Sequence, residues 1–329
     1  MQQPESAEHR PGPDAIDISY VIPIYNESET LPLLFDALRA TLDRIAPRYR
    51  VEVLLVDDGS RDDTWQQIEA GAARDPRFCG VRLSRNFGHQ AALTCGYHCA
   101  RGRAVICLDA DLQDPPETTL RMIEAWEQGA DVVFAVRSTR PGETWLKLAT
   151  ARGFYWLIER LGGIRAPRNA GDFRLLSRRA LAALNALPEH HRYIRGLVGW
   201  LGFQTATITY ERHERVAGVT KYPFRKMLRF AMDAIVSMSF APLRMAYTMA
   251  IVAAVPFVLF LFYGLIRWLV FNEQFAKGWA SLILAVIVFG TTTLIFIGIM
   301  GEYVGRIYEE VKNRPLFLIS DRTSSKEKE

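Results

Sequence analysis

The sequence lacks several features that mark common protein classes. Its four cysteines all lie in the first third of 329 residues, and no second ligand pair follows them at zinc-finger spacing, so they indicate reduced thiols in a cytosolic domain. Residues 1–14 contain no apolar core of the kind that a secretory signal needs, and we expect a disordered tail over residues 1–15. A net charge of +4 without a basic stripe argues against nucleic acid as a partner.

Glycine-rich nucleotide-binding loops are also missing. The chain has no Gly-x-Gly-x-x-Gly and no Gly-Lys-Ser/Thr, so neither a dinucleotide-binding fold nor a P-loop ATPase is supported. A nucleotide held through acidic residues and a metal fits the sequence better.

Charged residues are absent from two long runs near the C-terminus, Met245 to Ile266 and Gly278 to Gly301. Each run reaches the ~20 residues that an α-helix needs to cross a bilayer. We therefore expect two transmembrane helices, at about 245–268 and 278–301, with a buried core helix as the alternative.

The charges that flank this hairpin, residues 245–303, indicate its orientation. Lysine and arginine gather outside its two ends, whereas the loop between the runs holds only Arg267 and Lys277, together with Glu273. By the positive-inside rule both outer ends are cytosolic. The sequence thus predicts a multi-pass membrane protein with a cytosolic N-terminal domain and a cytosolic tail at 304–329.

Residues 221–244, just before the first run, mix apolar and basic side chains. This pattern is typical of an amphipathic helix that lies on anionic lipid. The alternative is a helix packed only on the catalytic domain.

The N-terminal domain alternates short β-rich runs with longer helical stretches, which predicts an α/β fold with a mostly parallel sheet. The expected strands are Ile18 to Ile24, Val51 to Val56, Val81 to Ser84, Ala104 to Leu108 and Asp131 to Val136. In open α/β sheets ligands bind outside the carboxyl ends of the strands. The residues that follow each strand are therefore candidates for a binding site.

Asp109 and Asp111 follow the fourth expected strand. Residues two apart in an extended chain point to the same side, so these like charges repel unless a positive group lies between them. Mg²⁺ typically combines one or two carboxylates with substrate phosphates. The pair predicts a bound metal diphosphate, and two solvated loop aspartates are the alternative.

Some acidic residues at these strand ends have structural explanations. Asp114, followed by two prolines and Glu117, fits a helix N-cap with a capping box. Ser60 with Asp63 fits a second capping box. The aspartates at 57–58 are not needed for that cap, and one of them is available to accept a hydrogen bond from a nucleotide base.

Several segments together resemble the inverting glycosyltransferases of family 2, which have the GT-A fold: Val21 to Glu27, Val56 to Ser60, Asn86 to Ala91, Leu108 to Glu117, Gly171 to Arg174 and Gly301 to Tyr308. More narrowly, they resemble the membrane-anchored polyisoprenyl-phosphate glycosyltransferases, the group that contains dolichol-phosphate mannose synthase and the bactoprenol glucosyl transferases. The resemblance covers Ile18 to about Pro315. It implies a GT-A catalytic domain over 16–220 and a Mg²⁺ or Mn²⁺ cofactor.

The resemblance also implies roles for individual residues. The nucleotide-sugar site would comprise Pro23, Tyr25, Asn26, Glu27, Asp58, Asp109, Ala110, Asp111 and Gln113. Asp109 and Asp111 would also hold the metal. The segment Asn86 to Gln90 is most similar to the bactoprenol glucosyl transferases, which suggests UDP-glucose as donor, while mannose, galactose and amino-arabinose stay open.

The implied acceptor is a polyisoprenyl phosphate such as undecaprenyl phosphate, at the cytosolic face of the bacterial inner membrane. A phosphate monoester has its second pKa near ~6, so it is largely a dianion at neutral pH and needs no strong general base. The site must instead supply positive charge. Candidates for the acceptor phosphate are Arg137, at a strand end, and then Lys147, Arg152, Arg174, Arg215 and Lys221.

Asp172 is the acidic residue that we assign to the reaction centre, together with Arg137 as the second catalytic candidate. Asp172 would either accept a proton or fix a sugar hydroxyl, and the sequence does not decide between these roles.

Two other functions compete with this interpretation. A processive polysaccharide synthase would carry a Gln-x-x-Arg-Trp motif, whereas the Arg-Trp pair at 267–268 lacks the glutamine. A non-catalytic membrane scaffold would have no physical need to keep the acidic residues and Arg137 together. A homo-oligomer is left open by these motifs.

The division of the acidic residues into metal ligands and a helix cap can be tested. Asp111→Asn should abolish sugar transfer and Asp109→Asn should impair it severely, because both lose a metal-binding oxygen. Asp114→Asn should mainly affect stability, since asparagine also caps helices. Equal loss of transfer in all three variants, each still folded, would contradict the division.

Overall fold

The computed structural model describes residues 15–138, 170–211 and 278–323, and scattered positions between 243 and 270. The chain divides into two compact units. The first comprises Met1–Tyr155, Ile164–Tyr222 and Pro315–Glu329, and the second Trp156–Gly163 and Pro223–Arg314.

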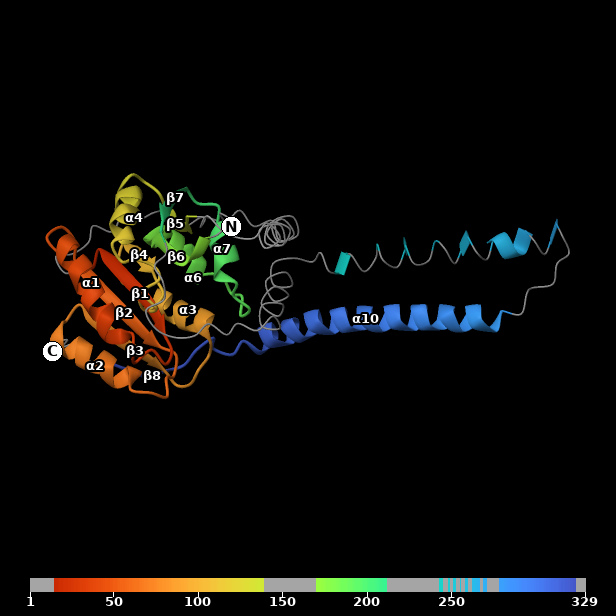
Figure 1. Ribbon diagram of the computed structural model, residues 1–329, viewed down its shortest axis with the longest axis horizontal. Coiled ribbons are helices and arrows are strands. Elements are labelled where there is room, and N and C mark those ends of the chain that lie inside the picture. The colour runs from red at the N-terminus through yellow and green to blue at the C-terminus, as the bar shows by residue number, and fades with distance from the viewer. Residues whose placement is uncertain are drawn as a thin grey trace. The chain divides into compact units, whose positions relative to one another are not determined.

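The first unit is built on an eight-stranded sheet with the order β7-β5-β6-β4-β1-β2-β3-β8 (Figure 1). The strands are β1 (Ile18–Ile24), β2 (Val51–Asp57), β3 (Phe78–Leu83), β4 (Ala104–Cys107), β5 (Val132–Arg137), β6 (Ala170–Ser177), β7 (Thr205–Tyr210) and β8 (Ile319–Arg322). β1 pairs in parallel with β2 and β4, β2 with β3, and β5 with β7. β6 runs antiparallel to β4 and β5, and β8 to β3. The expected α/β fold with a mostly parallel sheet is confirmed.

Helices connect the strands. They are α1 (Leu31–Ile45), α2 (Thr64–Arg74), α3 (His89–Cys99), α4 (Thr118–Glu127), α6 (Arg178–Asn185) and α7 (Ile194–Trp200). In α1 the buried residues include Leu31, Leu34, Leu38 and Leu42, which recur every three or four positions and so form one apolar face. This face packs into the main hydrophobic core.

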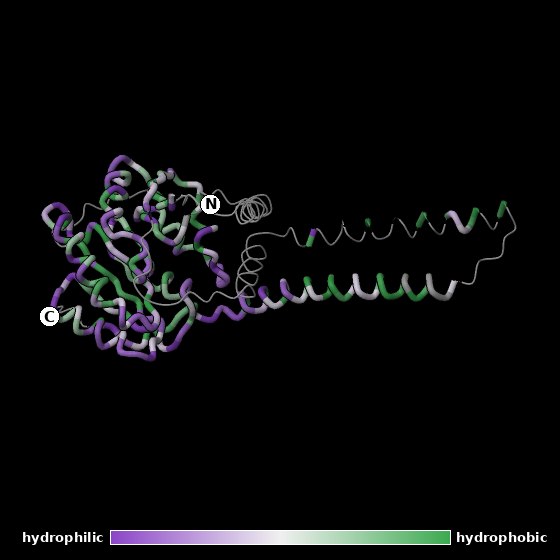
Figure 2. Tube along the Cα trace, in the orientation of Figure 1, coloured by the Kyte–Doolittle hydropathy of each residue, from purple (hydrophilic) through white to green (hydrophobic). Residues whose placement is uncertain are grey.

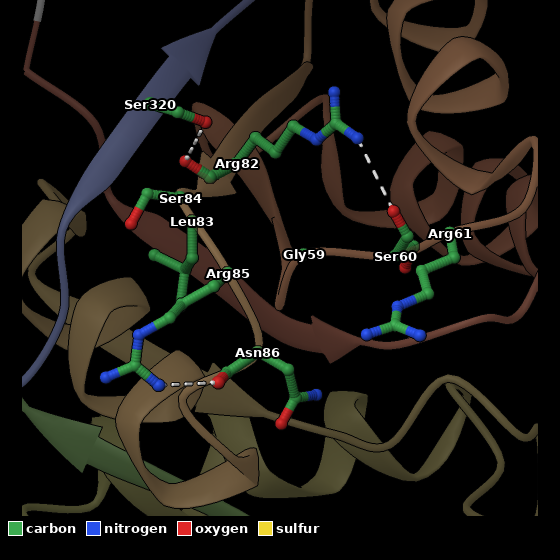
Figure 3. A pocket seen from close by; sticks show the side chains of 9 residues that line it. All are labelled: Gly59, Ser60, Arg61, Arg82, Leu83, Ser84, Arg85, Asn86 and Ser320. Atoms are coloured by element: carbon green, nitrogen blue, oxygen red, sulfur yellow. Dashed lines mark hydrogen bonds between the residues drawn. The ribbon is translucent and has the colours of Figure 1, made fainter.

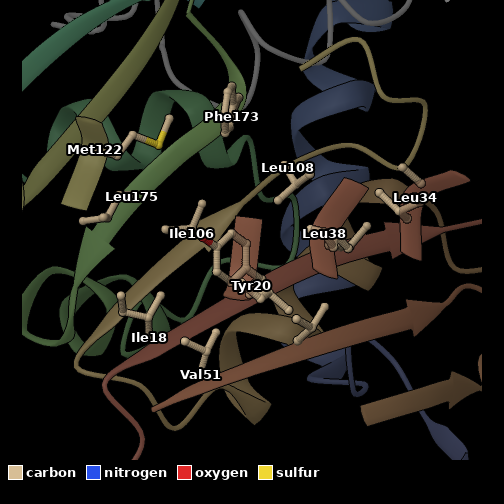
Figure 4. Close-up of a cluster of buried hydrophobic side chains, with 14 of the residues drawn as sticks. Ile18, Tyr20, Leu34, Leu38, Val51, Ile106, Leu108, Met122, Phe173 and Leu175 are labelled. Carbon is tan, nitrogen blue, oxygen red and sulfur yellow. The ribbon is translucent and has the colours of Figure 1, made fainter. Parts of the chain in front are cut away.

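The core surrounds the central strands (Figure 4). Every residue of β1 and β2 is buried, as expected for parallel strands covered on both faces. A buried polar pair lies among them: the Ser19 hydroxyl donates to Glu52 Oε1 at 2.6 Å, and Arg101 Nη2 lies 2.8 Å from Glu52 Oε2. The buried carboxylate is thereby hydrogen-bonded and paired, which offsets the cost of removing it from water.

The C-terminal segment closes one edge of the sheet. Residues 304–329 were expected to be a tail, but Ile319–Arg322 forms β8, and the Gly80 amide donates to Thr323 Oγ1 at 2.8 Å. Phe317 and Ile319 pack against a small apolar cluster that includes Val81. β8 thus pairs with β3, which would otherwise be an edge strand with unpaired backbone groups on that side.

The second unit contains α10 (Trp279–Lys312), a helix of 34 residues. Its apolar character is visible as hydrophobic colouring along much of its length (Figure 2). In the part of the chain that the structure describes, one helical stretch, Ala285–Lys312, is long and apolar enough to cross a membrane. The helix expected at 278–301 is therefore present and continues to Lys312.

The two-helix hairpin is not shown. Most of the run expected at 245–268 lies outside the described residues, as do almost all of the amphipathic segment 221–244 and residues 1–14 of the expected tail.

The packing of β8 generates a stability prediction. Phe317→Ala should lower the free energy of unfolding by about 2 kcal/mol, less than for a fully buried phenylalanine, because the side chain is only half-buried. For a unit of this size the loss corresponds to about 4–8 °C in thermal midpoint.

The neighbouring Leu318 is a matched control, since it is 54% exposed. Leu318→Ala should change the midpoint by no more than about 2 °C, from a loss within about 0.5 kcal/mol. Both midpoints can be measured on detergent-solubilised protein by near-ultraviolet circular dichroism. Equal midpoints for the two variants would show that β8 does not anchor the chain end to the sheet.

Candidate functional site

The candidate site lies where the strands β1 to β4 end. Because these strands are parallel, their carboxyl ends meet at one edge of the sheet. β6 runs the other way, so its first residues, Ala170 to Asp172, lie at the same edge. Arg137, the last residue of β5, completes the set.

The loop after β1 is joined to the loop after β2. The Asn26 amide donates to Ser60 Oγ at 2.9 Å, and the Arg61 amide donates to Asn26 Oδ1 at 2.9 Å. Asn26 has φ 52°, a left-handed conformation that asparagine tolerates. Ser60 is therefore not a helix cap: α2 begins after Asp63, and no side-chain bond caps it. The expected capping box is wrong because the Ser60 hydroxyl is used between the loops.

The remaining residues of the loop after β1 differ in exposure. Pro23 is buried within β1, whereas Tyr25 is 41% exposed. The Glu27 carboxylate accepts from Thr30 Oγ1 at 2.6 Å, and its amide donates to Thr64 Oγ1 at 3.0 Å. Of these residues, Tyr25 therefore offers the most side-chain surface to a ligand.

Asp58 fixes the loop after β3. Its two carboxylate oxygens accept from the amides of Phe87 at 2.7 Å and Gly88 at 2.9 Å, and the residue is 3% exposed. Burial raises the pKa of Asp58, against the lowering effect of the two amides. Gly88 has φ 97°, a conformation that favours glycine, and α3 begins at the next residue, His89. Asp58 thus sets where α3 starts.

The loop after β4 carries the Asp109–Gln113 segment. Its backbone turns at Leu112, which has φ 55°, an uncommon conformation for a leucine. The Gln113 amide donates to Asp111 Oδ1 at 3.2 Å. Ala110 is buried at 5% exposure, while the Asp109 side chain is 32% exposed. Asp109 is therefore partly exposed at the sheet edge, while Ala110 packs in the hydrophobic core.

Asp109 lies in a strongly acidic environment. Burial is the largest cause that raises its pKa to about 6, and the negative charges of Asp172, Asp114 and Asp111 add to it, while His89 acts in the opposite direction. A carboxylate in this setting binds a proton or a metal ion more readily than an isolated one.

Asp172 is the most heavily paired acidic residue of the site. Its oxygens lie 2.5 Å from Arg174 Nη2 and 2.7 Å from Arg195 Nη2, and Arg195 Nε donates to Oδ1 at 3.1 Å. His89 Nε2 lies 3.4 Å from Asp172 Oδ2 and 4.0 Å from Asp109 Oδ1. One imidazole thus connects the two carboxylates that the sequence assigned to different roles.

Asp114 contradicts a second expected cap. It is buried at 1% exposure, the Tyr210 hydroxyl donates to it, and Arg137 Nη2 lies 3.9 Å from Oδ1. α4 begins only at Thr118, with Glu117 in the N-cap position and no side-chain bond. The local pattern of Asp114 and two prolines is that of a helix start, but the residue instead belongs to the environment of Arg137. The expectation that Asp114→Asn changes only a helix cap is therefore wrong.

Arg137 is hydrogen-bonded to Tyr210 and lies close to Gly171. Its Nε donates to the Tyr210 hydroxyl at 3.1 Å, and a Cβ added at Gly171 would lie 3.3 Å from its Nη2. Its side chain is 31% exposed. Burial lowers the pKa of Arg137, but Tyr210 and then Asp114 and Asp109 outweigh this and raise it, so the guanidinium stays charged.

The other residues expected to bind the acceptor phosphate are not shown at the site surface. Arg174 is fully buried at 0% exposure, and it donates to the carbonyls of Gly171 and Asp172 as well as to the Asp172 carboxylate. It does not face a ligand, so its expected contact with the acceptor phosphate is corrected. Lys147, Arg152, Arg215 and Lys221 lie outside the described residues.

Three residues with a place in this site had no role assigned from the sequence: His89, Arg195 and Tyr210. His89 follows a strand end and could have been found by that signal. Arg195 is on α7 and Tyr210 ends β7, and neither helix nor strand was expected. Their proximity to Asp172 and Asp114 arises from tertiary packing.

Asp109 and Asp111 are the candidate ligands for a metal ion. Within the described ranges, no three histidine, cysteine or acidic side chains converge into a cage for an ion. Asp109 and Asp111 nevertheless offer oxygen ligands from one loop, and Asp109 has the acidic surroundings that favour a cation. This fits a Mg²⁺ type of site, in which one or two carboxylates are completed by substrate phosphates.

A cavity of about 400 Å³ adjoins this edge of the sheet (Figure 3). Its lining comes from the loop after β2, the end of β3 and β8: Gly59, Ser60, Arg61, Arg82, Leu83, Ser84, Arg85, Asn86 and Ser320. Gly59 must be glycine, since an added Cβ would lie 2.5 Å from the Arg85 carbonyl carbon. The cavity is next to Asp58 in sequence and does not include Asp109 or Asp172.

An α/β domain with acidic and basic side chains at the carboxyl ends of its strands is typical of nucleotide-dependent enzymes. The family model of glycosyl transferase family 2 matches residues 19–184. The chain belongs to this family.

Curated relatives match along most of their length. The SfII prophage-derived bactoprenol glucosyl transferase of Shigella flexneri is 41% identical over 306 residues, which cover 92% of this chain and 97% of that protein. A prophage bactoprenol glucosyl transferase homolog of Escherichia coli is 37% identical over 307 residues, covering 92% and 98%. An uncharacterized glycosyltransferase of Bacillus subtilis, YkcC, is 41% identical over 304 residues, covering 92% and 93%.

Similar solved structures include glucosyl-3-phosphoglycerate synthase from Mycobacterium tuberculosis in complex with Mn²⁺, uridine diphosphate and phosphoglyceric acid. It is 20% identical with a TM-score of 0.49, and the match covers 70% of this chain and 82% of that one.

The contact between Tyr210, Arg137 and Asp114 generates a prediction. Tyr210→Phe leaves the buried Asp114 and the partly exposed Arg137 without their shared hydroxyl, so it should cost about 1–3 kcal/mol of unfolding free energy. Tyr49→Phe is the control, because its hydroxyl donates to Glu127 at the exposed surface. Thermal unfolding followed by circular dichroism compares them. A midpoint for Tyr210→Phe as high as that of the control would mean that the hydroxyl does not hold Arg137.

Proposed function

We propose that the chain transfers glucose from UDP-glucose to a polyisoprenyl phosphate, such as undecaprenyl phosphate, with inversion at the sugar C1. The observation that carries the proposal is the arrangement at one sheet edge of Asp109 and Asp111, which suit a metal diphosphate, with Arg137 nearby. The names of the relatives support glucose and a bactoprenol acceptor.

Each substrate has residues suited to it. The nucleotide would lie along Tyr25, Asn26 and Asp58, with the adjoining cavity, of a size typical for small ligands, able to take part of it. Asp109 and Asp111 would hold Mg²⁺ or Mn²⁺, and the bound ion would neutralise charge on the departing diphosphate. Gln113 follows in the same loop and would lie beside the diphosphate.

Arg137 suits the acceptor phosphate. Its guanidinium is charged, partly exposed and held in place by Tyr210 and Asp114. A planar guanidinium matches two phosphate oxygens at once. The arrangement would position the acceptor oxygen against C1 and reduce the repulsion between the two phosphate groups.

The reaction then needs no proton transfer. An acceptor phosphate oxygen donates an electron pair to C1, the bond from C1 to the diphosphate oxygen breaks, and UDP leaves with that electron pair. The acceptor is already largely a dianion near neutral pH. The residues contribute orientation and charge, and fixed charge of this kind commonly accounts for most of the rate enhancement when negative charge moves between phosphate groups.

We place the protein at the bacterial inner membrane with its catalytic unit in the cytosol. α10 supports the membrane part of this proposal, because many of its large apolar residues are exposed, among them Leu282, Val286 and Leu294. A lipid acceptor requires a site near the bilayer, and nucleotide sugars are cytosolic donors.

The proposal is tested with purified protein, Mg²⁺, undecaprenyl phosphate and a panel of labelled nucleotide sugars. Label should enter the organic phase with UDP-glucose and disappear when Mg²⁺ is chelated. Label only from a mannose, galactose or amino-arabinose donor would change the sugar and keep the reaction. No label from any donor would overturn the proposal.

Arg137→Ala extends the test to the acceptor. It should raise the KM for undecaprenyl phosphate by at least about tenfold, because a charged hydrogen bond is worth about 1.5–3 kcal/mol, and leave UDP affinity nearly unchanged. Arg121→Ala is the control, since this exposed arginine donates to the Thr209 carbonyl and is not part of the site. A selective loss of UDP affinity in Arg137→Ala would move Arg137 to the donor side.

A further inference from the structure

Asp172 has little capacity left to accept a proton. The carboxylate is 3% exposed, and both of its oxygens already face cationic donors: Arg174 and Arg195 at Oδ1, and Arg195 and His89 at Oδ2. Burial would raise the pKa of Asp172, but His89, Arg174 and Arg195 hold it well below its usual value. A general base must be able to reach and take a proton, and this carboxylate is instead an anion enclosed by cations.

Arg195 differs from Arg174 in what it exposes. Arg174 is fully buried, whereas the Arg195 side chain is 37% exposed. Arg195 binds Asp172 through the Nε and Nη2 side of its guanidinium, at 3.1 and 2.7 Å. Among the described residues, none forms a hydrogen bond or ion pair with its Nη1.

A guanidinium has five N–H donors arranged in a planar fork. Asp172 uses one from Nε and one from Nη2, so both hydrogens of Nη1 and the second hydrogen of Nη2 remain. These form the end of the fork, which matches two oxygens of a phosphate group. The bond to Asp172 fixes the plane of the fork and thereby the direction in which this end points.

The strand register places this fork near the expected reaction centre. Cys107 pairs with Arg174 in the antiparallel ladder of β4 and β6. Continuing the same register by two residues on each strand brings Asp109 opposite Asp172. His89, within 4.0 Å of Asp109 Oδ1 and 3.4 Å of Asp172 Oδ2, agrees with that placement.

We propose that Arg195 is a phosphate-binding residue of this site and that Asp172 is a positioning residue that orients it. The ligand class is a phosphoryl group, either the donor diphosphate or the acceptor phosphate monoester. The proposal rests on the proposed function for the identity of these two phosphates. In this role Asp172 orients Arg195 and does not accept a proton.

A double-mutant comparison separates this role from that of a base. If Asp172 acts through Arg195, then Asp172→Asn, Arg195→Gln and the double variant should all lose activity to a similar extent, on the order of 100-fold, because residues that act as one unit are not additive. If Asp172 were an independent base, the two losses would multiply in the double variant. That outcome would overturn the proposal.

Asp172→Asn leaves Arg174 buried without its carboxylate, so this variant can fail to fold. Arg195→Gln keeps the pair of Asp172 and Arg174 and therefore carries the test by itself. Arg195→Ala adds a second readout: guanidinium chloride at millimolar concentration should restore part of its activity, and wild type should gain none. Absence of rescue together with full activity in Arg195→Gln would overturn the proposal.

Binding measurements identify which phosphate Arg195 contacts. Calorimetric titration of UDP with Mg²⁺ into Arg195→Gln should show at least tenfold weaker binding if the donor diphosphate is the ligand. An at least tenfold higher KM for undecaprenyl phosphate, with UDP binding unchanged, assigns the acceptor. If neither quantity changes, Arg195 does not bind phosphate.

Arg179→Gln is the matched control, because Arg179 is exposed and pairs with Asp131, the residue before β5, away from the candidate site. Its activity should stay within about twofold of wild type. The titration with UDP does not require turnover. Weaker UDP binding in Arg195→Gln would therefore support the inference even if no sugar donor is accepted, so that failure of the proposed function is distinguishable from failure of this inference.

Discussion

The pairing of β6 against β4 is the constraint on which the candidate site depends. The four parallel strands β1 to β4 end in polar loops at one edge of the sheet. Parallel strands alone would bring together only the loops that follow strands, not the first residues of a strand. β6 enters the sheet in the opposite direction, so the chain delivers Gly171 and Asp172 beside the end of β4. The same strand pairs with β5 and brings Gly171 close to Arg137. Without this reversal, Asp172 and the two arginines paired with it would not lie beside the acidic loop after β4.

Where β4 and β6 pair, acidic side chains have basic or hydrogen-bonding partners within a few ångströms. Asp109, Asp114 and Asp172 lie near one another, and their partners differ. Asp114 is paired with Tyr210 and Arg137, Asp172 with two arginines, and His89 lies between Asp172 and Asp109. The pKa of Asp109 is raised to about 6 whereas that of Asp172 is lowered, so the protein compensates the charge of Asp109 far less completely. A cation brought with a diphosphate would complete that balance, which gives a physical reason for the acidic loop to be where it is.

The sequence predicted the parts of the fold that follow from local pattern. The buried strand Ile18–Ile24 appears as expected because a mostly apolar run between polar segments leaves few alternatives. β6, β7 and β8 were missed, since they contain polar or exposed residues and pair with strands that are distant along the chain. Both expected capping boxes failed for a related reason. Ser60 and Asp114 match the local pattern, but Asn26 and Tyr210, which lie far away in sequence, use them instead.

The site was predicted to the same extent. Asp58, Asp109, Asp111 and Arg137 were expected at strand ends, and the structure has them there, because that rule needs only the order of strands and loops. Their roles in binding stay predictions. The rule did not identify Arg195, whose position depends on how α7 packs. The strand-end rule also could not show that Arg174 is buried. Gly171 to Arg174 were not expected to form a strand, so the direction of their side chains was not predicted.

The closing strand also determines when the sheet can be completed during synthesis. The hydrogen bond between Gly80 and Thr323 joins residues 243 positions apart, and α10 lies between them in the chain. A ribosome must therefore translate the whole of α10 before β3 gains its outer neighbour. Until then, the nascent catalytic unit carries an open strand edge of the kind that chaperones bind and that promotes aggregation. Completion of the sheet is thus coupled to production of the apolar helix, so a chain terminated within α10 leaves both parts unfinished.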